Sequence, residues 1–267
     1  MSALVCIRRL CNLSPKVATA THSFVRWAST SEQEKPNTTG MYTRVENEAE
    51  RILKITVVPN GKTRENAYIL YDSEVCDGAI IDPGLDGYKL LRAIEKCQTN
   101  ISQIILTHGH LNHVASIGEI IQNFGSIPII VSELDLPFLK ANRVLNEDEM
   151  ELNKIKDGDQ IEVAGHKGTA LLTPGHTPGS MCYHFGNFLF SGDTLLCNAI
   201  GSCDHEESKK LGLTCTEDQL KESIKSKLFV LPKETMVLPG HGQFTNIATE
   251  ALLNPIVGRK ASISFVC

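Results

Sequence analysis

Apolar residues recur with two different periods along the first half of the chain. The runs ILKITVVP (52–59) and ENAYILYD (65–72) are rich in β-branched and aromatic residues and flank a polar turn with a glycine, which predicts a β-hairpin. Shorter apolar runs at 78–84, 101–108 and 127–132 predict three further strands.

Two segments between these runs have the apolar spacing of helices. They are YKLLRAIEKC (88–97) and VASIGEIIQNFG (114–125), and the second ends at a glycine, as helices often do. Strands and helices therefore alternate, which predicts an α/β layered domain. The charged stretch 133–156 is expected to be helical.

The second half of the chain returns to strand-like runs. These are QIEVAG (160–165), GTALLTPGH (168–176), SMCYHFGNFLFSGD (180–193) and ETMVLPGHG (234–242). Residues 213–232 interrupt them with one amphipathic helix, for which Thr216 is the expected N-cap and Glu217 and Asp218 belong to the first turn. Only 25 residues follow Gly242, so we expect no second domain after it.

Composition narrows the class of protein and its partners. The 267 residues are 42% hydrophobic and 21% charged, as in soluble globular proteins. A net charge of −5 gives no reason to expect nucleic acid or an anionic membrane as a partner. No apolar run reaches the roughly 18–20 residues that a transmembrane helix needs. The nine cysteines form no CxxC pair, so we expect reduced thiols in an intracellular protein rather than a zinc finger.

The first thirty residues differ from the rest of the chain. Residues 1–30 contain four basic residues and no acidic one, and they are rich in Ser, Thr and Ala, which is typical of a mitochondrial transit peptide. We expect cleavage within 26–30 and a location in the mitochondrial matrix. The alternative is a disordered basic tail on a cytoplasmic protein. Residues 31–50 are expected to be a polar linker, and 51–260 to form the folded domain.

Side chains that bind metals follow the ends of four predicted strands. They are His108, His110, Asn112 and His113 after the first, His176 after the second, Asp193 after the third and His241 after the fourth. Loops after strand ends are where α/β folds usually build their sites. Imidazole suits zinc, iron and similar metals, and an HxH pair on an extended segment directs both rings to one side. The remaining histidines lack this setting and are expected not to be ligands, although one of them follows the Asp193 loop closely. These are His22, His166, His184 and His205.

In chain order, these motifs resemble those of the metallo-β-lactamase fold family. The family pattern HxHxDH, PGHTPGS, SGD and PGHG is matched here by HGHLNH, PGHTPGS, SGD and PGHG, and IIDPG (80–84) matches an early turn motif. The resemblance covers roughly residues 52–258. It implies an αββα sandwich, in which two mixed sheets face each other, helices lie outside and metal ions bind at one edge.

The resemblance also implies a set of ligands and a reaction. His108, His110 and His176 would hold a first metal ion, Asp193 would bridge, and His113 and His241 would hold a second ion together with position 112. Zinc is the metal that we expect first, with iron and manganese as alternatives. The most similar branch resembles glyoxalase II, whose metal-activated hydroxide attacks small acyl thioesters of glutathione.

Position 112 departs from the family pattern. The family has Asp there, whereas Asn112 offers only a neutral carbonyl oxygen, so we predict weaker occupancy of the second metal position. The change also removes an acceptor that could orient the attacking hydroxide. We therefore predict that Asp193 and Asn112 are the positions that bear most directly on catalysis. Asn112 is compatible with three interpretations. The second metal ion binds through the other ligands, the enzyme works with one metal ion, or the chain is a metal-binding pseudoenzyme without catalytic activity.

The main alternative enzyme is a mitochondrial persulfide dioxygenase. That branch resembles this fold but holds one iron at the positions of His108, His176 and Asp193, so Asn112 would do less harm. It usually carries GRTDF and an AHDY-type ending, whereas this chain has IGSCDH (200–205) and PGHG. We therefore place the hydrolase first.

Residues that contact the substrate are not evident from the sequence. Four lysines, an arginine and a tyrosine are candidates for contact with a substrate, and the lysines are expected to lie on a solvated helix face. They are Lys209, Lys210, Lys221, Lys225, Arg143 and Tyr183. The acyl group and the oligomeric state are likewise not determined by the sequence.

Overall fold

The computed structural model describes residues 40–44, 51–61, 64–144 and 151–259. The predicted transit peptide, with its cleavage region, lies outside these residues. Part of the segment that we expected to be a linker is described, and there Gly40–Arg44 forms strand β1, which pairs with β2. None of the helices in the described ranges has the length and apolar composition needed to cross a membrane.

The first half of the chain builds a seven-stranded mixed sheet in the order β1 to β7. Strands β1 to β4 pair antiparallel, and β4 to β7 pair parallel. The remaining strands of this sheet are β2 (Ile52–Asn60), β3 (Glu65–Asp72), β4 (Asp77–Ile81), β5 (Gln103–Ile105), β6 (Ile129–Ser132) and β7 (Leu152–Ile155). The predicted hairpin is therefore confirmed as β2 and β3.

The second half builds a six-stranded sheet in the order β15-β14-β11-β10-β9-β8. Its neighbours are antiparallel except for β11 and β14, which are parallel. Its strands are β8 (Gln160–Val163), β9 (His166–Leu172), β10 (Met181–Phe185), β11 (Phe188–Gly192), β14 (Met236–Pro239) and β15 (Thr245–Asn246). A small ribbon of β12 (Leu195–Leu196) and β13 (Ala199–Ile200) follows β11.

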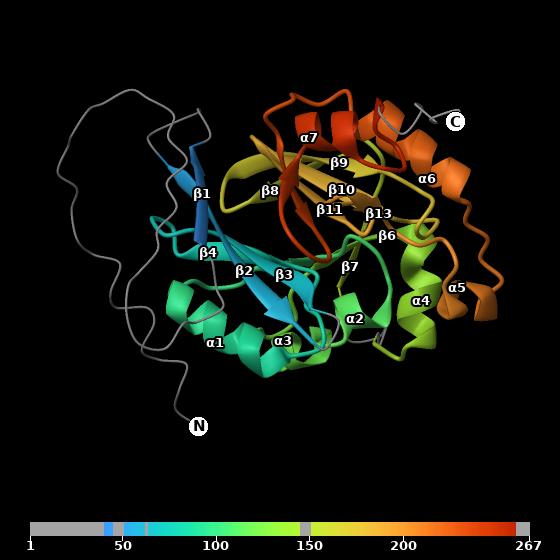
Figure 1. The fold of residues 1–267 in the computed structure, drawn as a ribbon. Coiled ribbons are helices and arrows are strands. Elements are labelled where there is room, and N and C mark those ends of the chain that lie inside the picture. Colours follow the sequence, from blue (N-terminus) through green and yellow to red (C-terminus); the bar gives the residue numbers. More distant parts are fainter. Residues whose placement is uncertain (1–39, 45–50, 62–63, 145–150, 260–267) are drawn as a thin grey trace, which may run out of the picture.

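The two sheets face each other and bury the central core. Leu53 and Tyr68 from the first sheet pack with Phe185 and Phe190 from the second, and the rings of Tyr68 and Phe190 meet edge to face at 5.2 Å. Helices cover both outer faces, so the predicted αββα sandwich of two mixed sheets is confirmed (Figure 1). Each sheet has apolar residues on both faces, so it packs against the other sheet on one face and against helices on the other. This is the layering that the family resemblance predicted.

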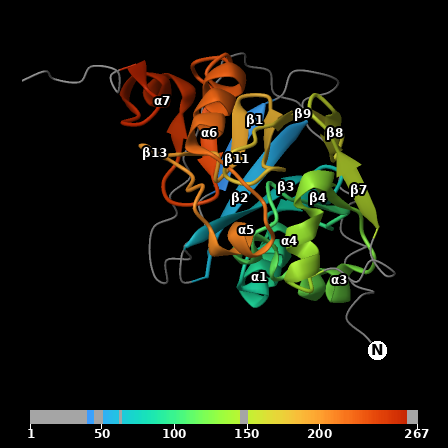
Figure 2. The same ribbon diagram turned by 90° about the vertical axis from the view of Figure 1, so that its right-hand side faces the viewer.

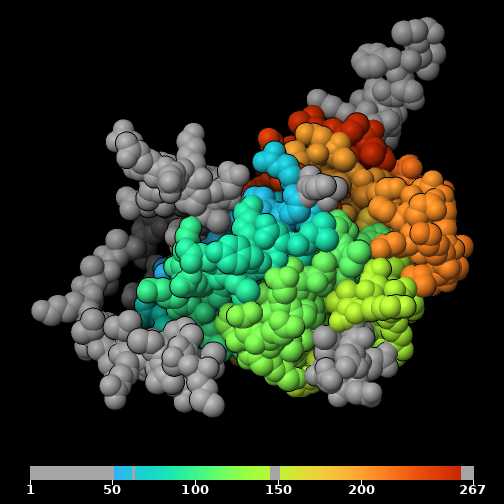
Figure 3. Space-filling model, turned by 90° about the horizontal axis from the view of Figure 1, so that it is seen from below, coloured from blue at the N-terminus to red at the C-terminus, as the bar shows by residue number. Residues whose placement is uncertain are grey.

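The helices divide between the outer faces. Helices α1 (Gly87–Cys97) and α3 (Ile117–Phe124) cover the first sheet (Figure 1), and the teal and green part of the chain that contains them occupies much of the face seen from below (Figure 3). Helix α6 (Glu217–Ser223), the π turn Ile224–Leu228 and α7 (Ile247–Leu253) cover the second. The shorter helices are α2 (Leu111–Val114), α4 (Leu136–Ala141) and α5 (Glu206–Lys210). The last two lie side by side at one end of the molecule (Figure 2).

Local sequence explains where some of these helices begin, and where two predictions needed correction. The side chain of Thr216 accepts a hydrogen bond from the N–H of Gln219, which confirms the predicted N-cap of α6. Among the described residues of the stretch 133–156, a 3₁₀ turn (Glu133–Asp135) and α4 are helical, but Leu152–Ile155 forms β7 in parallel with β6, so the helix expected at that end is wrong. Residues 153–154 of β7 are exposed, which gave its sequence a polar, helix-like character. The strand predicted at 101–108 is shorter than expected: β5 ends at Ile105, and the N–H of Leu106 makes one further hydrogen bond to the carbonyl oxygen of Ile130 in β6.

Candidate metal centre

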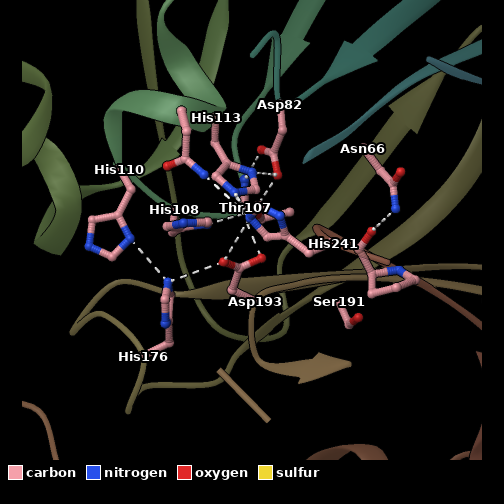
Figure 4. Close-up of polar contacts among 12 residues, drawn as sticks. Asn66, Asp82, Thr107, His108, His110, His113, His176, Ser191, Asp193 and His241 are labelled. Carbon is pink, nitrogen blue, oxygen red and sulfur yellow. Dashed lines mark hydrogen bonds and ion pairs between the residues drawn. The ribbon is translucent and has the colours of Figure 1, made fainter. Parts of the chain in front are cut away.

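Three histidine side chains converge beyond the carboxyl ends of β5 and β9. His108 and His110 follow β5, His176 follows β9, and each is at most 3% exposed. Nδ1 of His110 lies 3.0 Å from Nε2 of His176, and one nitrogen of each ring lies within 4.8 Å of the other two (Figure 4). The structure thus brings together the residues that we predicted around a first metal ion.

A second group of side chains lies beside the first. The Nε2 atoms of His113 and His241 are 3.2 Å apart, and the amide nitrogen of Asn112 is 3.3 Å from Nε2 of His241. Helix α2 carries Asn112 and His113 on one turn, while His241 arrives from the loop after β14. These residues surround the predicted second position.

Asp193, from the loop after β11, lies between the two groups. Its Oδ2 is 3.6 Å from Nε2 of His176 and 3.4 Å from Nε2 of His241, and its Oδ1 is 3.7 Å from Nε2 of His113 (Figure 4). One carboxylate that faces both groups has the geometry of a bridging ligand. Burial opposes the negative charge of Asp193, but the histidines around it outweigh burial and lower its pKa.

The protonation of the first group suits a bound cation. Burial lowers the pKa of His110 to about 2 and that of His176 to about 4, and burial also lowers the pKa of His108 well below its ordinary value. The rings are therefore neutral near pH 7 and present lone pairs. Nε2 of His108 is buried, and none of the described residues offers it a hydrogen-bond partner. Tetrahedral zinc with bonds of about 2.0–2.1 Å separates its nitrogen ligands by about 3.3 Å, so these residues fit a metal ion.

The backbone near the second group leaves no room for a larger residue at Gly240. A Cβ atom there would lie 2.2 Å from Oδ1 of Asp193 and 2.9 Å from Cε1 of His113. The first glycine of the PGHG motif, Gly240, is therefore required, because its backbone approaches the metal-facing side chains too closely for a side chain of its own.

Asp82 holds the second group from behind, a role that we did not predict. It is the third residue of the IIDPG segment, directly after β4, and its φ of 52° is an uncommon conformation for a residue with a side chain. Its Oδ1 accepts a hydrogen bond from the N–H of Thr107 at 2.8 Å, and its Oδ2 is 3.2 Å from Nδ1 of His113. Since His113 donates through Nδ1, its Nε2 is left free to bind a metal. Burial opposes charge on His113, but Asp193 and Asp82 outweigh burial and raise its pKa.

Asp135 holds the first group, and no sequence signal pointed to it. This fully buried residue accepts hydrogen bonds from the N–H of Gly109 at 2.9 Å, the N–H of Gly179 at 2.7 Å and the hydroxyl of Thr177 at 2.7 Å. One carboxylate therefore joins the loop of His108 and His110 to the loop of His176. Burial raises the pKa of Asp135 to about 6, against the effect of its three donors.

The histidines predicted not to be ligands fall into different settings. His166 lies at the start of β9, with Nε2 3.0 Å from Oδ2 of Asp72 and away from the metal-facing groups. His184 lies within β10, and His22 lies outside the described residues. His205 is different, because its ring centroid is 4.5 Å from that of His110 and 4.8 Å from that of His176. It packs against the centre without joining a group of metal-facing atoms.

The side chains considered for substrate contact have other partners or lie in solvent. Lys209 pairs with Asp204, and Lys221 pairs with Glu217 on its own helix. Tyr183 is fully buried, and its hydroxyl donates to the carbonyl oxygen of Leu106 at 2.8 Å. The others are exposed: Arg143, Lys210 and Lys225. This agrees with the solvated helix face that we expected for the lysines.

Comparisons with known proteins agree with this geometry. A family profile described as the metallo-beta-lactamase superfamily matches residues 61–241. Hydroxyacylglutathione hydrolase GloC of Haemophilus influenzae is 28% identical over 229 residues, which cover 78% of this chain and all of the relative. Two solved structures share the fold. The BLEG-1 B3 metallo-beta-lactamase has a TM-score of 0.64 and 28% identity over 76% of this chain and 99% of its own. TTHA1623 in a di-iron-bound form has a TM-score of 0.63 and 29% identity over 74% and 98%.

Proposed function

The chain belongs to the metallo-β-lactamase superfamily, and on that premise we propose that it is a metal-dependent hydrolase of small acyl thioesters, of which glutathione thioesters are the first candidates. The main support for hydrolysis is the position of Asp193 between two groups of imidazole nitrogens. Its carboxylate oxygens lie 3.4–3.7 Å from three of these nitrogens. The substrate class rests on the likeness to GloC over that relative's whole length.

The roles of the side chains follow from where their atoms point. His108, His110 and His176 would hold a first metal ion, and His113 and His241 a second, with Asp193 shared. Bound metal ions of this kind lower the pKa of a water molecule and polarise a carbonyl group. Hydrolysis adds the water oxygen to the thioester carbon, breaks the carbon–sulfur bond and leaves an acid and a thiol. Asp193 faces both groups of imidazole nitrogens and would orient that water.

Asn112 supports a second candidate function. Its amide nitrogen lies 3.3 Å from Nε2 of His241, so a neutral group stands where the family has a carboxylate. A single ion held by His108, His176 and Asp193 would not need position 112, and that arrangement suits a mononuclear iron persulfide dioxygenase. The di-iron form of TTHA1623, at 29% identity, favours two ions and keeps the hydrolase first.

Metal analysis combined with a thioester assay tests the proposal. The purified protein is expected to contain one or two metal ions per chain and to release thiol from S-lactoylglutathione, while His110→Ala should lose about 10²-fold or more of that activity because a metal ligand is gone. His184→Ala is the matched control, since that histidine lies within β10 outside the metal-facing groups. Full activity in His110→Ala would overturn the site. A single iron with oxygen-dependent persulfide turnover would favour the dioxygenase.

Location is a separate proposal. Residues 1–30 are basic and contain no acidic residue, which supports import into the mitochondrial matrix. This support does not depend on the structure of the folded domain. A small-molecule thioester is the partner that we expect, and neither nucleic acid nor a membrane is needed for the reaction.

A further inference from the structure

One candidate ligand, His110, differs from three others in the hydrogen-bond partner of the ring nitrogen that does not face the metal position. A metal-binding histidine normally donates its other N–H to an acceptor, which fixes the tautomer and the ring orientation. Nδ1 of His108 is 3.0 Å from the hydroxyl of Thr107, and Nδ1 of His176 is 2.7 Å from the carbonyl oxygen of Ser202. Nδ1 of His113 faces Asp82, as described above.

His110 is turned the other way. Its Nδ1 faces Nε2 of His176 at 3.0 Å, so the proton of a metal-bound ring must lie on Nε2. That Nε2 is buried and has no hydrogen-bond partner among the described residues. A buried N–H without an acceptor is costly, so a nearby acceptor is expected.

The nearest carboxylate to this atom comes from helix α5. Oε2 of Glu207 lies 3.9 Å from Nε2 of His110, and the Glu207 side chain is 35% exposed, partly withdrawn from solvent. Because a ring that binds a metal ion through Nδ1 carries its proton on Nε2, the contact is an N–H facing a carboxylate. At 3.9 Å the two atoms are beyond hydrogen-bond distance, so the partly exposed Glu207 side chain has to rotate toward the ring to accept the proton. The ring of His205, just before α5, packs against His110 and brings this helix over the centre.

We propose that Glu207 accepts the Nε2–H of His110 when that histidine binds a metal ion through Nδ1, and is therefore a positioning residue of the first metal position. This inference rests on the proposed function, because it assumes that the first group binds metal. Glu207 belongs to none of the groups of metal-facing atoms, so it would act through His110. It acts by keeping the His110 ring in the tautomer and orientation that direct Nδ1 inward.

Zinc titration of chelator-treated protein by calorimetry tests the proposal. The binding step that His176→Ala removes reports the first position, and the step that His241→Ala removes reports the second. Glu207→Ala is expected to weaken the first step by about 10- to 100-fold, as loss of an outer carboxylate typically does, and to leave the second unchanged. Glu207→Gln keeps an acceptor oxygen and should recover part of the loss.

Glu206→Ala is the matched control. Glu206 is on the same helix, its side chain is 77% exposed, and it pairs with Lys209 rather than with the centre. Equal zinc affinity in Glu207→Ala and Glu206→Ala would overturn the inference while leaving the proposed function standing. A wild-type protein that takes up no zinc or iron would overturn both. Equal melting temperatures of the metal-free variants would show that the fold is intact, and if Glu207→Ala melts lower, Glu207→Gln carries the comparison.

Discussion

Asn112 directs its side-chain amide toward His241, with Nδ2 3.3 Å from Nε2 of that histidine. The pair comes from segments 129 residues apart and meets at the proposed second metal position. An amide that reaches this point can turn its carbonyl oxygen inward, but it contributes no negative charge. A substitution of Asn112 by Asp therefore changes the negative charge that the protein offers to a metal ion at this position.

Asn112→Asp is expected to strengthen the second metal position. A unit negative charge about 4 Å from a cation is worth about 1 to 4 kcal/mol at a protein surface, so zinc affinity at the second position should rise at least about fivefold. Calorimetric titration and metal content per chain measure the effect. Asn123→Asp, on the exposed face of α3, adds the same charge elsewhere and should change neither value. No difference between the two variants would show that position 112 is not a ligand.

Asp135 predicts a specific dependence of stability on pH. Burial raises its pKa from 3.8 to about 6, so the folded protein takes up this proton before the unfolded chain does. The wild type should therefore gain stability relative to Asp135→Asn as the pH falls through about 6, by about 2 kcal/mol between pH 7 and pH 4.5. Urea unfolding of both metal-free proteins measures the difference, and their shared histidines cancel in the comparison. A constant difference across this range would contradict the raised pKa.

Gly179→Ala should destabilise the protein and weaken the first metal position. A Cβ atom at Gly179 would lie 2.6 Å from Oδ1 and 2.8 Å from the backbone nitrogen of Asp135, so the loop of His176 must move. Crowding of this kind in a packed interior costs about 1–3 kcal/mol. Gly118→Ala, on α3 with nothing within 4 Å of the added atom, should instead stabilise by up to about 1 kcal/mol. Thermal melting of the two variants would therefore move in opposite directions.

Deletion of residues 1–30 should leave the protein outside mitochondria. The four basic residues of this segment and its lack of acidic ones are typical of an import signal, which the truncated chain would lack. Fluorescence microscopy of the full chain and of the truncated chain, each fused to a fluorescent protein at the carboxyl end, provides the measurement. Mitochondrial fluorescence of the truncated chain would refute the transit peptide.

The sequence by itself determined the layered fold and the residues that face the candidate centre. Apolar periodicity indicated where most strands and helices lie, because each element must bury a face with its own period. The histidines and Asp193 could be chosen because each follows an apolar strand, and strand ends are where an α/β sandwich opens. The order of the motifs then indicated the arrangement of the sheets.

Tertiary structure alone decided which residues support these side chains. Asp135 joins Gly109 and Gly179, which are 26 and 44 residues away in the chain, and Glu207 reaches His110 across 97 residues, so no local pattern marks either carboxylate. For the same reason β7 was missed, because pairing with β6 rather than its own polar sequence makes it a strand. Local periodicity records which face of an element is buried, whereas contacts between loops depend on how the two sheets pack.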